Sequence, residues 1–331
     1  MKAIVCREYG SPDVLRLEEV EKPVPGDGEV LVKVHATSVN AGDWRVLRAT
    51  PFLVRLAFGL FKPKISILGA DIAGVVEATG PGVTQFKVGD RVFGDISRYG
   101  FGGFAEYACV PEEPMALMPS ALSFDDAAAV PVASVVALQA LRDAGKLLAG
   151  QKVLIYGASG GVGSFAVQIA KYMGSEVTAV CSTGNMETVC ALGADHAVDY
   201  TREDALSKGT CFDLILAANG SRSIFDYRRA LSPNGIFVLS GGSMAQLLQT
   251  LLLGPLLSMT GSRKLRNFLV RPNGKDVAFV AGLIEAGLIR PIIDRRYTLA
   301  EVPLALHYLE EGHARGKVII SVATTVAENV P

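Results

Sequence analysis

Clustered cysteines, metal-binding histidine motifs and long apolar runs are all missing from this sequence of 331 residues. The five cysteines are widely separated and form no CxxC pair, which argues against a disulfide framework and against a structural zinc knot. They are Cys6, Cys109, Cys181, Cys190 and Cys211. The four histidines form no HExxH motif. Because the chain opens on what reads as a strand, without the apolar segment of a signal peptide, the sequence favours a reducing cytoplasm.

Neither sign of charge is in excess, with 32 Lys and Arg against 33 Asp and Glu. This balance gives no indication of nucleic acid binding. Two apolar stretches, 51–61 and 244–259, are shorter than the roughly 20 residues of a membrane-spanning helix. Arg55 interrupts the first, and Gly254-Pro255 is expected to break the second. We therefore predict no stable membrane insertion, and interpret both stretches as pocket walls or a subunit contact, with peripheral membrane contact as the alternative.

The most informative segment is a glycine-rich turn between an apolar strand at 152–156 and an apolar helical stripe that begins at Val162. Glycine permits positive φ, close approach of the backbone to a ligand and close packing of a helix on a strand. Free N–H groups at the start of such a helix can face a pyrophosphate. The alternative is a tight turn that binds nothing. The residues expected at the cofactor are Gly157, Ala158, Ser159, Gly160, Gly161, Val162 and Gly163.

The chain is long enough for two domains, and its pattern of expected strands and helices changes along its length. Residues 1 to about 120 contain short strands between glycine and proline signals, as in a small barrel. From about 151, strands and helices alternate, which predicts a parallel sheet with helices on both faces. Helices at 277–286 and 302–311 and a strand at 317–322 are expected to complete the first domain.

The residues after the second strand of this sheet indicate which dinucleotide is bound. An acidic residue about 20 positions past the glycines would bind the ribose 2′-hydroxyl of NAD. Ser182 stands there instead, followed by Asn185, and neither would repel a 2′-phosphate. We therefore predict NADP. Both residues could alternatively cap the next helix, and Lys171 and Tyr200 are further candidate donors.

Ordered matches over nearly the whole chain show that it resembles the medium-chain dehydrogenase/reductase superfamily, in particular its zinc-independent zeta-crystallin-like quinone oxidoreductases and enone reductases. The matching segments are 1–4 with Tyr9, Gly10 and Pro12, then 38–43, 69–76, 86–92, the glycine turn, 195–200 and 316–318.

The resemblance implies an α/β fold in which a doubly wound Rossmann sheet is inserted in a catalytic domain with a GroES-like barrel. We expect residues 1–122 and 266–331 to form the catalytic domain and 123–265 the NADP-binding domain. The resemblance also implies a homodimer, commonly joined through edge strands of two Rossmann domains. Further residues expected at the cofactor are Asn219, Ser240, Gly241 and Lys317.

Zinc members of the superfamily differ from this chain at their metal positions. They carry a Cys where this chain has Asn40, and a His-Glu pair where it has Ala70 and Asp71. Catalytic zinc needs three good N, S or O ligands. We therefore predict no metal site. Val136 is a second departure, because relatives usually have there a Thr that can contact the nicotinamide.

Three residues are candidates for the chemistry, each with a structural alternative. Asn40 could contact substrate or the nicotinamide ribose, or could form a turn after a strand. Asp43 could orient a neighbour or relay a proton, or could cap a helix or pair with Arg45. Tyr99, in a glycine-rich loop, could act as a gate or simply cover the core.

Without a metal, reduction of a simple ketone needs another stabiliser for the developing alkoxide, whereas a conjugated carbonyl delocalises that charge itself. The sequence therefore predicts a zinc-independent, NADPH-dependent oxidoreductase acting on a small apolar quinone, enone or alkenal. The alternatives are zinc-free interconversion of alcohols and ketones, and a protein that binds NADPH without turnover.

Overall fold

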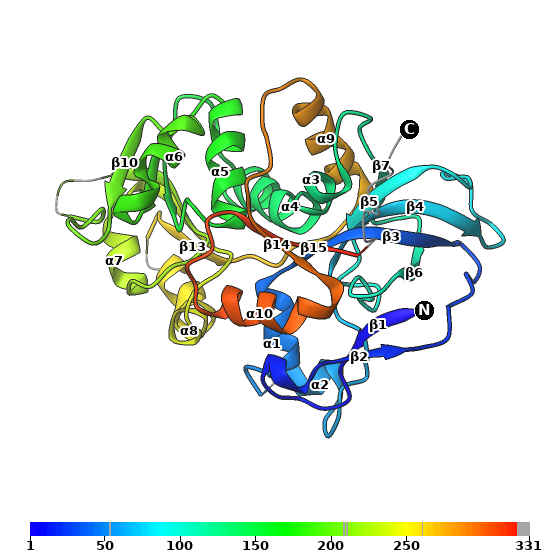
Figure 1. Ribbon diagram of the computed structural model, residues 1–331. Coiled ribbons are helices and arrows are strands. Elements are labelled where there is room, and N and C mark those ends of the chain that lie inside the picture. The colour runs from blue at the N-terminus through cyan, green and yellow to red at the C-terminus, as the bar shows by residue number, and fades with distance from the viewer. Residues whose placement is uncertain (53, 208, 210, 260, 323–331) are drawn as a thin grey trace. The chain divides into compact units, whose positions relative to one another are not determined.

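The chain folds into two compact units, and the computed structural model describes residues 1–331 except 53, 208, 210, 260 and 323–331 (Figure 1). Unit 1 comprises Met1–Val132, Pro272–Glu285 and Ile293–Pro331, and unit 2 comprises Ala133–Arg271 and Ala286–Ile292. The sequence put the boundaries at 122/123 and 265/266. In the structure, residues 123–132 pack with unit 1, and residues 266–271 and 286–292 pack with unit 2.

Unit 1 is built on a seven-stranded sheet made from both ends of the chain. Its order is β14-β15-β3-β4-β5-β7, with β6 also paired to β3, and β1 and β2 form a separate antiparallel pair. The strands are β1 (Lys2–Val5), β2 (Arg16–Glu19), β3 (Glu29–Val39), β4 (Asp71–Thr79), β5 (Arg91–Asp95), β6 (Tyr107–Pro111), β7 (Met115–Leu117), β14 (Ile293–Thr298) and β15 (Lys317–Ser321). The helices are η1 (Pro12–Val14), α1 (Ala41–Leu47), α2 (Val54–Phe58), α3 (Phe124–Ala128), α9 (Gly274–Glu285), η4 (Leu299–Glu301) and α10 (Val302–Glu310).

The long strand β3 organises unit 1 because it pairs with β4, β6 and β15 at once. Its apolar residues at 30, 32 and 34 are almost wholly buried and belong to a core with Ile72 and Val92. The C-terminal strand β15 runs antiparallel to β3, with Val318 opposite Val39. Residues from the two ends of the chain therefore share one sheet.

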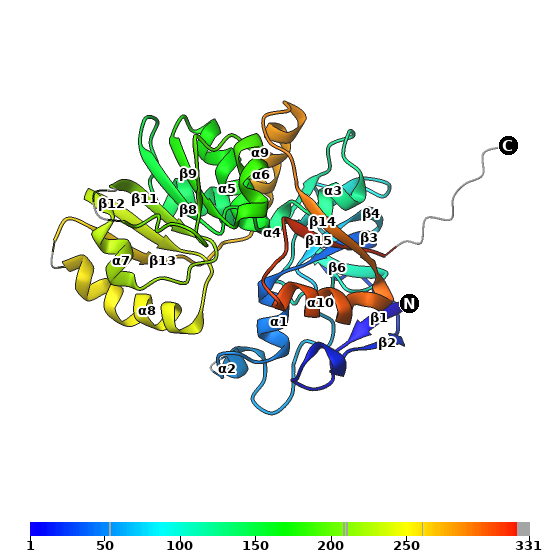
Figure 2. The ribbon, with the colours of Figure 1, turned by 60° about the vertical axis from the view of Figure 1, so that its left-hand side comes forward.

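Unit 2 is a six-stranded parallel sheet in the order β10-β9-β8-β11-β12-β13. In chain order this is 3-2-1-4-5-6, the doubly wound arrangement that the sequence predicts. Figure 2 shows α5 and α6 on one face of this sheet and α7 and α8 on the other. The strands are β8 (Lys152–Tyr156), β9 (Glu176–Cys181), β10 (His196–Asp199), β11 (Phe212–Ala217), β12 (Leu231–Leu239) and β13 (Lys264–Asn267). The helices are η2 (Ala140–Ala144), α5 (Gly161–Tyr172), η3 (Thr183–Asn185), α6 (Met186–Ala191), α7 (Ile224–Arg229) and α8 (Met244–Met259), while α4 (Pro131–Gln139) crosses the unit boundary.

The expected break at Gly254-Pro255 is wrong, since α8 runs unbroken through both residues. Pro255 lies on the exposed side of the helix, whereas Gly254 is buried against β13. A Cβ on Gly254 would lie 3.3 Å from the carbonyl oxygen of Leu265. The small residue thus allows close packing of α8 on the sheet, and this tertiary contact outweighs the helix-breaking tendency of the proline.

Gly163 gives a direct test of how α5 packs on β8. A Cβ there would lie 2.0 Å from the carbonyl oxygen of Gly157, which is backbone and cannot rotate away. We expect Gly163→Ala to lower the free energy of unfolding of unit 2 by at least about 1–3 kcal/mol, measured by urea denaturation.

The matched control is Gly282→Ala in α9, an exposed helical position with nothing within 4 Å of the added carbon. There alanine should leave stability unchanged or raise it by up to about 1 kcal/mol. Equal effects of the two substitutions would contradict the packing argument.

Candidate functional site

The predicted glycine turn joins β8 to α5, and protein packing alone requires two of its glycines. Gly157 has φ of +75°, and a Cβ there would lie 2.8 Å from Cβ of Asn219. Gly163 allows the first turn of α5 to lie against the carbonyl of Gly157. These two residues hold the turn tight at the carboxyl end of the central strand.

The other part of the turn is open in a way that suits an anion. Gly160 caps α5, and the nearest atom to a Cβ there, the carbonyl oxygen of Gly157, would be 3.6 Å away. The N–H groups of Gly161, Val162 and Gly163 have no acceptor within the described part of the chain. A pyrophosphate fits these unpaired donors at the positive end of the helix dipole.

Three predicted cofactor residues from two segments, the turn itself and the residues after β9, meet here. Asn185 is buried and donates its amide N–H groups to the hydroxyl oxygens of Ser159, at 3.2 Å, and Ser182, at 3.0 Å. Each hydroxyl accepts one hydrogen bond from Asn185 and can still donate its own proton. This Ser159-Ser182-Asn185 trio presents donors and no carboxylate.

An acidic residue that sequence reasoning missed lies next to this trio. Asp199, at the end of β10, accepts hydrogen bonds from the hydroxyl of Thr183 and from the backbone N–H and hydroxyl of Thr201, the last two at 3.0 and 2.7 Å. The bond from Thr183 is the largest cause that lowers the pKa of Asp199. The pairing of β10 with β9 places this carboxylate beside the trio. The spacing of residues along the chain did not predict this position.

The remaining predicted donors of unit 2 lie in different places. Tyr200 is 58% exposed, and its N–H donates to the carbonyl of Cys181 at the edge of the trio. Lys171 lies in the last turn of α5, at the opposite end from the glycine turn, and pairs with Asp195 at 2.8 Å. Tyr200 therefore lies beside the trio, where the 2′-phosphate is expected, whereas Lys171 lies away from it.

Asn219, Ser240 and Gly241 follow the carboxyl ends of β11 and β12. The N–H groups of Ser240 and Gly241 donate to the carbonyl of Ala217 at 3.0 and 3.1 Å, which pins the two loops together. Asn219 is exposed and packs against Gly157. This is the edge of a doubly wound sheet at which ligands bind, so the three residues are well placed for the nicotinamide half of the cofactor.

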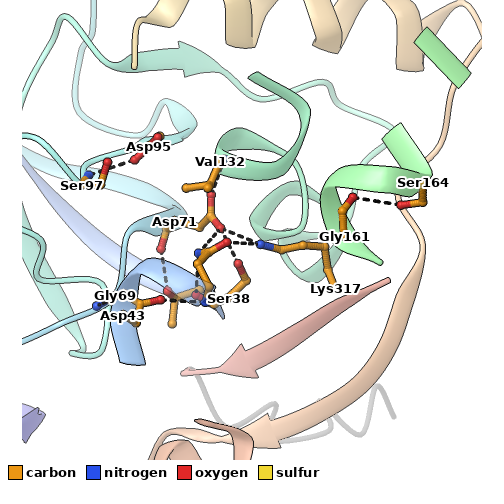
Figure 3. Close-up of polar contacts among 12 residues, drawn as sticks. Ser38, Asp43, Gly69, Asp71, Asp95, Ser97, Val132, Gly161, Ser164 and Lys317 are labelled. Atoms are coloured by element: carbon orange, nitrogen blue, oxygen red, sulfur yellow. Dashed lines mark hydrogen bonds and ion pairs between the residues drawn. The ribbon is translucent and has the colours of Figure 1, made fainter. Parts of the chain in front are cut away.

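Unit 1 contains a buried polar network centred on Asp71 (Figure 3). One carboxylate oxygen of Asp71 accepts hydrogen bonds from Ser38, from Asn40 at 2.9 Å and from Lys317 at 3.1 Å. The other oxygen accepts the backbone N–H of Val132 at 2.7 Å. Asp71 is fully buried and Lys317 is 3% exposed, so their charges neutralise each other out of water.

This network accounts for the positions of two predicted site residues. The Lys317 ammonium donates to the side-chain oxygen of Asn40 at 2.6 Å and to Asp71, leaving one proton uncommitted. The Asn40 amide N–H groups are directed to Asp71 and, at 3.4 Å, to the carbonyl of Ser38. The carboxamide of Asn40 therefore has a fixed orientation and keeps one acceptor lone pair for another group.

Asp43 contributes to the N-terminal cap of α1, as the first of its two structural alternatives predicted. Asn40 caps α1, and the Asp43 carboxylate accepts the N–H groups of Asn40 at 2.7 Å and Gly69 at 3.2 Å. Burial, together with the nearby charge of Asp71, raises the pKa of Asp43 to about 7. Asp43 thus ties α1 to the segment that leads into β4.

Asp95 is a third buried carboxylate, placed opposite Asp71 by the pairing of β4 and β5. One oxygen accepts the N–H of Ser97 at 2.9 Å, and the other has no partner among the described residues. Burial, followed by the charge of Asp71, raises the pKa of Asp95 to about 6. Three acids thus share a region that holds one lysine.

The structure does not bring Tyr99 into this network. Tyr99 is half-buried after β5, and burial together with a hydrogen bond to Glu113 raises the pKa of its hydroxyl. The neighbouring residue Phe101 is buried and has φ of +61°, an unusual conformation for a bulky side chain. Tyr99 as a gate stays a prediction.

Asp71, Asp95 and Ser38 were missed as site residues, although the sequence carries a signal for two of them. Asp71 and Asp95 each adjoin an apolar run of a strand, where a carboxylate is expected to need a buried partner. Within the described residues, no three His, Cys, Asp or Glu side chains lie together in a way that could hold a metal ion.

The chain is similar in sequence and in fold to known proteins. Two family models match, one described as an alcohol dehydrogenase GroES-like domain over residues 26–120 and one as a zinc-binding dehydrogenase over 192–320. A chloroplast envelope quinone oxidoreductase homolog of Arabidopsis thaliana is 36% identical, covering 97% of this chain and 98% of its own. A 2-methylene-furan-3-one reductase of Solanum lycopersicum is 35% identical, covering 97% of this chain and 79% of its own.

Solved structures agree with the sequence relatives. The quinone oxidoreductase from Coxiella burnetii has a TM-score of 0.87 at 30% identity and covers 98% of this chain and 99% of its own. A mycobacterial protein solved with NADPH has a TM-score of 0.81 at 26% identity and covers 97% of this chain and 100% of its own.

A doubly wound sheet with an open glycine cradle, in one chain with a GroES-like unit, defines an oxidoreductase that uses a nicotinamide cofactor. The chain belongs to the medium-chain dehydrogenase/reductase superfamily, in its zinc-independent quinone oxidoreductase branch. The predicted fold class and family are thereby confirmed.

The Asp71-Lys317 pair predicts strong thermodynamic coupling. We expect Lys317→Met or Asp71→Asn alone to lower the free energy of unfolding of the chain by about 3–5 kcal/mol, since each leaves the partner buried without its counterpart. The double variant should lose clearly less than the sum, in a double-mutant cycle measured by urea unfolding.

The control cycle is Lys171→Met with Asp195→Asn, a pair whose side chains are 33% and 36% exposed. Its coupling should stay below about 1 kcal/mol. Additive losses at Asp71 and Lys317 would show that their contact is energetically unimportant.

Asp95 predicts a pH dependence of stability. Its pKa is about 6 in the folded chain and about 3.9 when unfolded. The folded state therefore holds more protons between these values, and stability falls as pH rises through this window. We expect Asp95→Asn to gain thermal stability over the wild type as pH increases from about 4 to about 7, with little change above.

Differential scanning calorimetry across this range measures the effect. Asp27→Asn, at an exposed loop position, is the control and should follow the wild type at every pH. A pH-independent difference for Asp95→Asn would contradict the assignment.

Proposed function

We propose that this chain reduces small apolar quinones, enones or alkenals with hydride from NADPH. The observation that carries the proposal is the Ser159-Ser182-Asn185 trio beside the open N-terminus of α5. Its donors suit a 2′-phosphate. The residues that directly follow β9, positions 182–185, include no carboxylate that would bind a free ribose 2′-hydroxyl.

The substrate class rests on the relatives. One related protein is named as a reductase of a methylene-furanone, another as a quinone oxidoreductase homolog and a third, from Arabidopsis thaliana at 32% identity, as an NADPH-dependent alkenal/one oxidoreductase. All three names describe acceptors in which a carbonyl is conjugated. In such acceptors the charge left after hydride addition spreads into the carbonyl, so less stabilisation is asked of the protein.

The residues of this chain then bind and orient the cofactor and the substrate, and they exclude water from them. When bound, NADPH supplies the hydride. The N–H groups of Gly161, Val162 and Gly163 would hold the pyrophosphate, and the trio with Tyr200 the 2′-phosphate. Asn40, fixed by Lys317 and Asp71, keeps one lone pair with which its side-chain oxygen can accept a further hydrogen bond. Orientation of this kind can supply a large part of the rate.

Cytoplasmic location and a homodimer stay predictions. The names of related proteins include chloroplastic and mitochondrial forms. Among the described residues, no helix is both long and apolar enough to span a bilayer.

The activity test is NADPH oxidation with p-benzoquinone, methyl vinyl ketone, crotonaldehyde and cyclohexanone as acceptors, and NADP⁺ reduction with cyclohexanol. The proposal expects turnover of the conjugated acceptors and little or none of the saturated ketone and alcohol. Preference for the saturated pair would favour alcohol and ketone interconversion. NADPH binding without turnover of any acceptor would favour a non-catalytic role.

Ser182 tests the cofactor preference. Ser182→Asp places a carboxylate beside the 2′-phosphate, so we expect NADPH affinity to fall by at least about tenfold while NADH affinity rises. Isothermal titration calorimetry measures both constants. Thr188→Asp, the same added charge at an exposed position of α6, is the control and should change neither by more than about twofold. Unchanged NADPH binding by Ser182→Asp would exclude Ser182 from the phosphate site.

A further inference from the structure

Helix α8 has the opposite polarity to that of an ordinary surface helix. Its buried residues are polar or small, with Gln246 2% exposed, Thr250 1% exposed and Gly254 buried. Of its leucines, Leu253 and Leu257 are half-buried, and Leu257 packs against the core of the unit. A helix on the surface of a globular protein normally turns its apolar stripe toward the core. The outward residues are Leu247 (36% exposed), Leu248 (46%), Leu251 (57%), Leu252 (65%), Leu256 (60%) and Met259 (82%).

Hydrogen bonds fix this orientation. Gln246 donates to the carbonyl of Arg222, outside the helix, at 3.1 Å. Within the helix, the buried hydroxyl of Thr250 is satisfied by the carbonyl of Gln246 at 2.9 Å. Ser258 accepts the N–H of Leu265 from the edge strand β13 at 2.9 Å. Rotation of α8 to bury the exposed leucines would break the hydrogen bonds of Gln246 and Ser258 to residues outside the helix, so the exposed stripe is part of the packed structure of unit 2.

The stripe is long and uncharged. The outward residues follow the spacing i, i+1, i+4, i+5, i+9 and i+12, which places them along one side of the helix. None of the 16 residues of Met244–Met259 is charged. Contiguous exposed apolar surface of this kind marks a binding face for a protein or a membrane.

Charge distinguishes between these two partners. Residues 221–271, which hold α7, β12, α8 and β13, contain seven basic residues and one acidic residue, Asp226, although the whole chain has a net charge of −1. The basic residues are Arg222, Arg228, Arg229, Arg263, Lys264, Arg266 and Arg271. The positive charge of two of them is balanced by a neighbouring carboxylate, because Arg222 pairs with Asp204 and Arg229 with Asp226.

We propose that α8 binds the surface of an anionic lipid bilayer, lying in the plane of the membrane with its leucine stripe among the upper acyl chains. Basic residues beside it, Arg263 and Lys264 at the start of β13 among them, contact the lipid phosphates. An apolar stripe flanked by basic residues is the pattern of interfacial helices. At 16 residues the helix is about 24 Å long, which suits an in-plane position.

A second copy of the chain, joined through edge strands as in the homodimer that the resemblance implies, is the competing occupant of this face. Edge strand β13 adjoins α8, so pairing of two β13 strands would bring two leucine stripes together. It would also bring together two segments that each carry this excess of positive charge, which costs free energy. The surface of an anionic lipid bilayer would cover the apolar stripe and also neutralise the positive charge.

The experiment is vesicle flotation of the full chain. The vesicles are phosphatidylcholine alone or phosphatidylcholine with about one third phosphatidylglycerol. We expect binding to the anionic vesicles, weak binding to the neutral ones, and weaker anionic binding as salt increases. Absence of binding to anionic vesicles at low salt would overturn the proposal.

Variants locate the binding face. Leu251→Gln/Leu252→Gln/Leu256→Gln should weaken anionic-vesicle binding by at least about tenfold. The control carries the same change at three leucines of similar exposure elsewhere, Leu148, Leu288 and Leu304, and should bind like the wild type. Arg263→Ser/Lys264→Ser should remove most of the preference for anionic over neutral vesicles.

Circular dichroism and activity without vesicles should be unchanged in all three variants, because every altered side chain is at least partly exposed. Equal binding by the α8 variant and the leucine control would overturn the proposal. So would analytical ultracentrifugation showing a wild-type dimer that the α8 substitutions dissociate and that anionic vesicles do not compete away.

Discussion

The buried ion pair between Asp71 and Lys317 is the contact on which unit 1 depends. The two residues are 246 positions apart, yet their side chains lie 3.1 Å apart on strands that both neighbour β3. A charge in this environment is costly unless it is paired and hydrogen-bonded, so β15 has to reach this place in this register. The first and last parts of the chain are held in one sheet by this requirement and by the pairing of β15 with β3.

The same pair determines the electrostatics around it. The ammonium of Lys317 acts on Asp71, Asp43 and Asp95, and of these three acids Asp71 accepts a hydrogen bond from it. The pKa values of Asp43 and Asp95 are raised because burial disfavours their charged forms and the charge of Asp71 adds to the effect. Asn40 receives its fixed orientation from Lys317 and Asp71 together, so a candidate site residue inherits its geometry from the ion pair.

Local sequence patterns predicted the parts of the site that local geometry determines. The glycine turn, the following helix and the position of Ser182 depend on short-range spacing, and the structure brings Ser159, Ser182 and Asn185 together as donors. Lys317 could not be assigned to Asp71 in this way, because it is 246 positions away and reaches Asp71 through strands that both pair with β3. Asp199 lies beside the trio because β10 pairs with β9. Pro255 was misjudged for a related reason. Its effect depends on which side of α8 faces solvent, and that is decided by tertiary packing.

The central claim is that unit 2 holds NADPH through the N-terminus of α5 and the Ser159-Ser182-Asn185 trio. A crystal structure of the chain with NADPH tests it most directly. The account predicts the pyrophosphate within hydrogen-bonding distance of the N–H groups of Gly161, Val162 and Gly163, and the 2′-phosphate on Ser182 with Ser159 or Tyr200. A 2′-phosphate bound elsewhere, or a pyrophosphate that does not contact this turn, would contradict it.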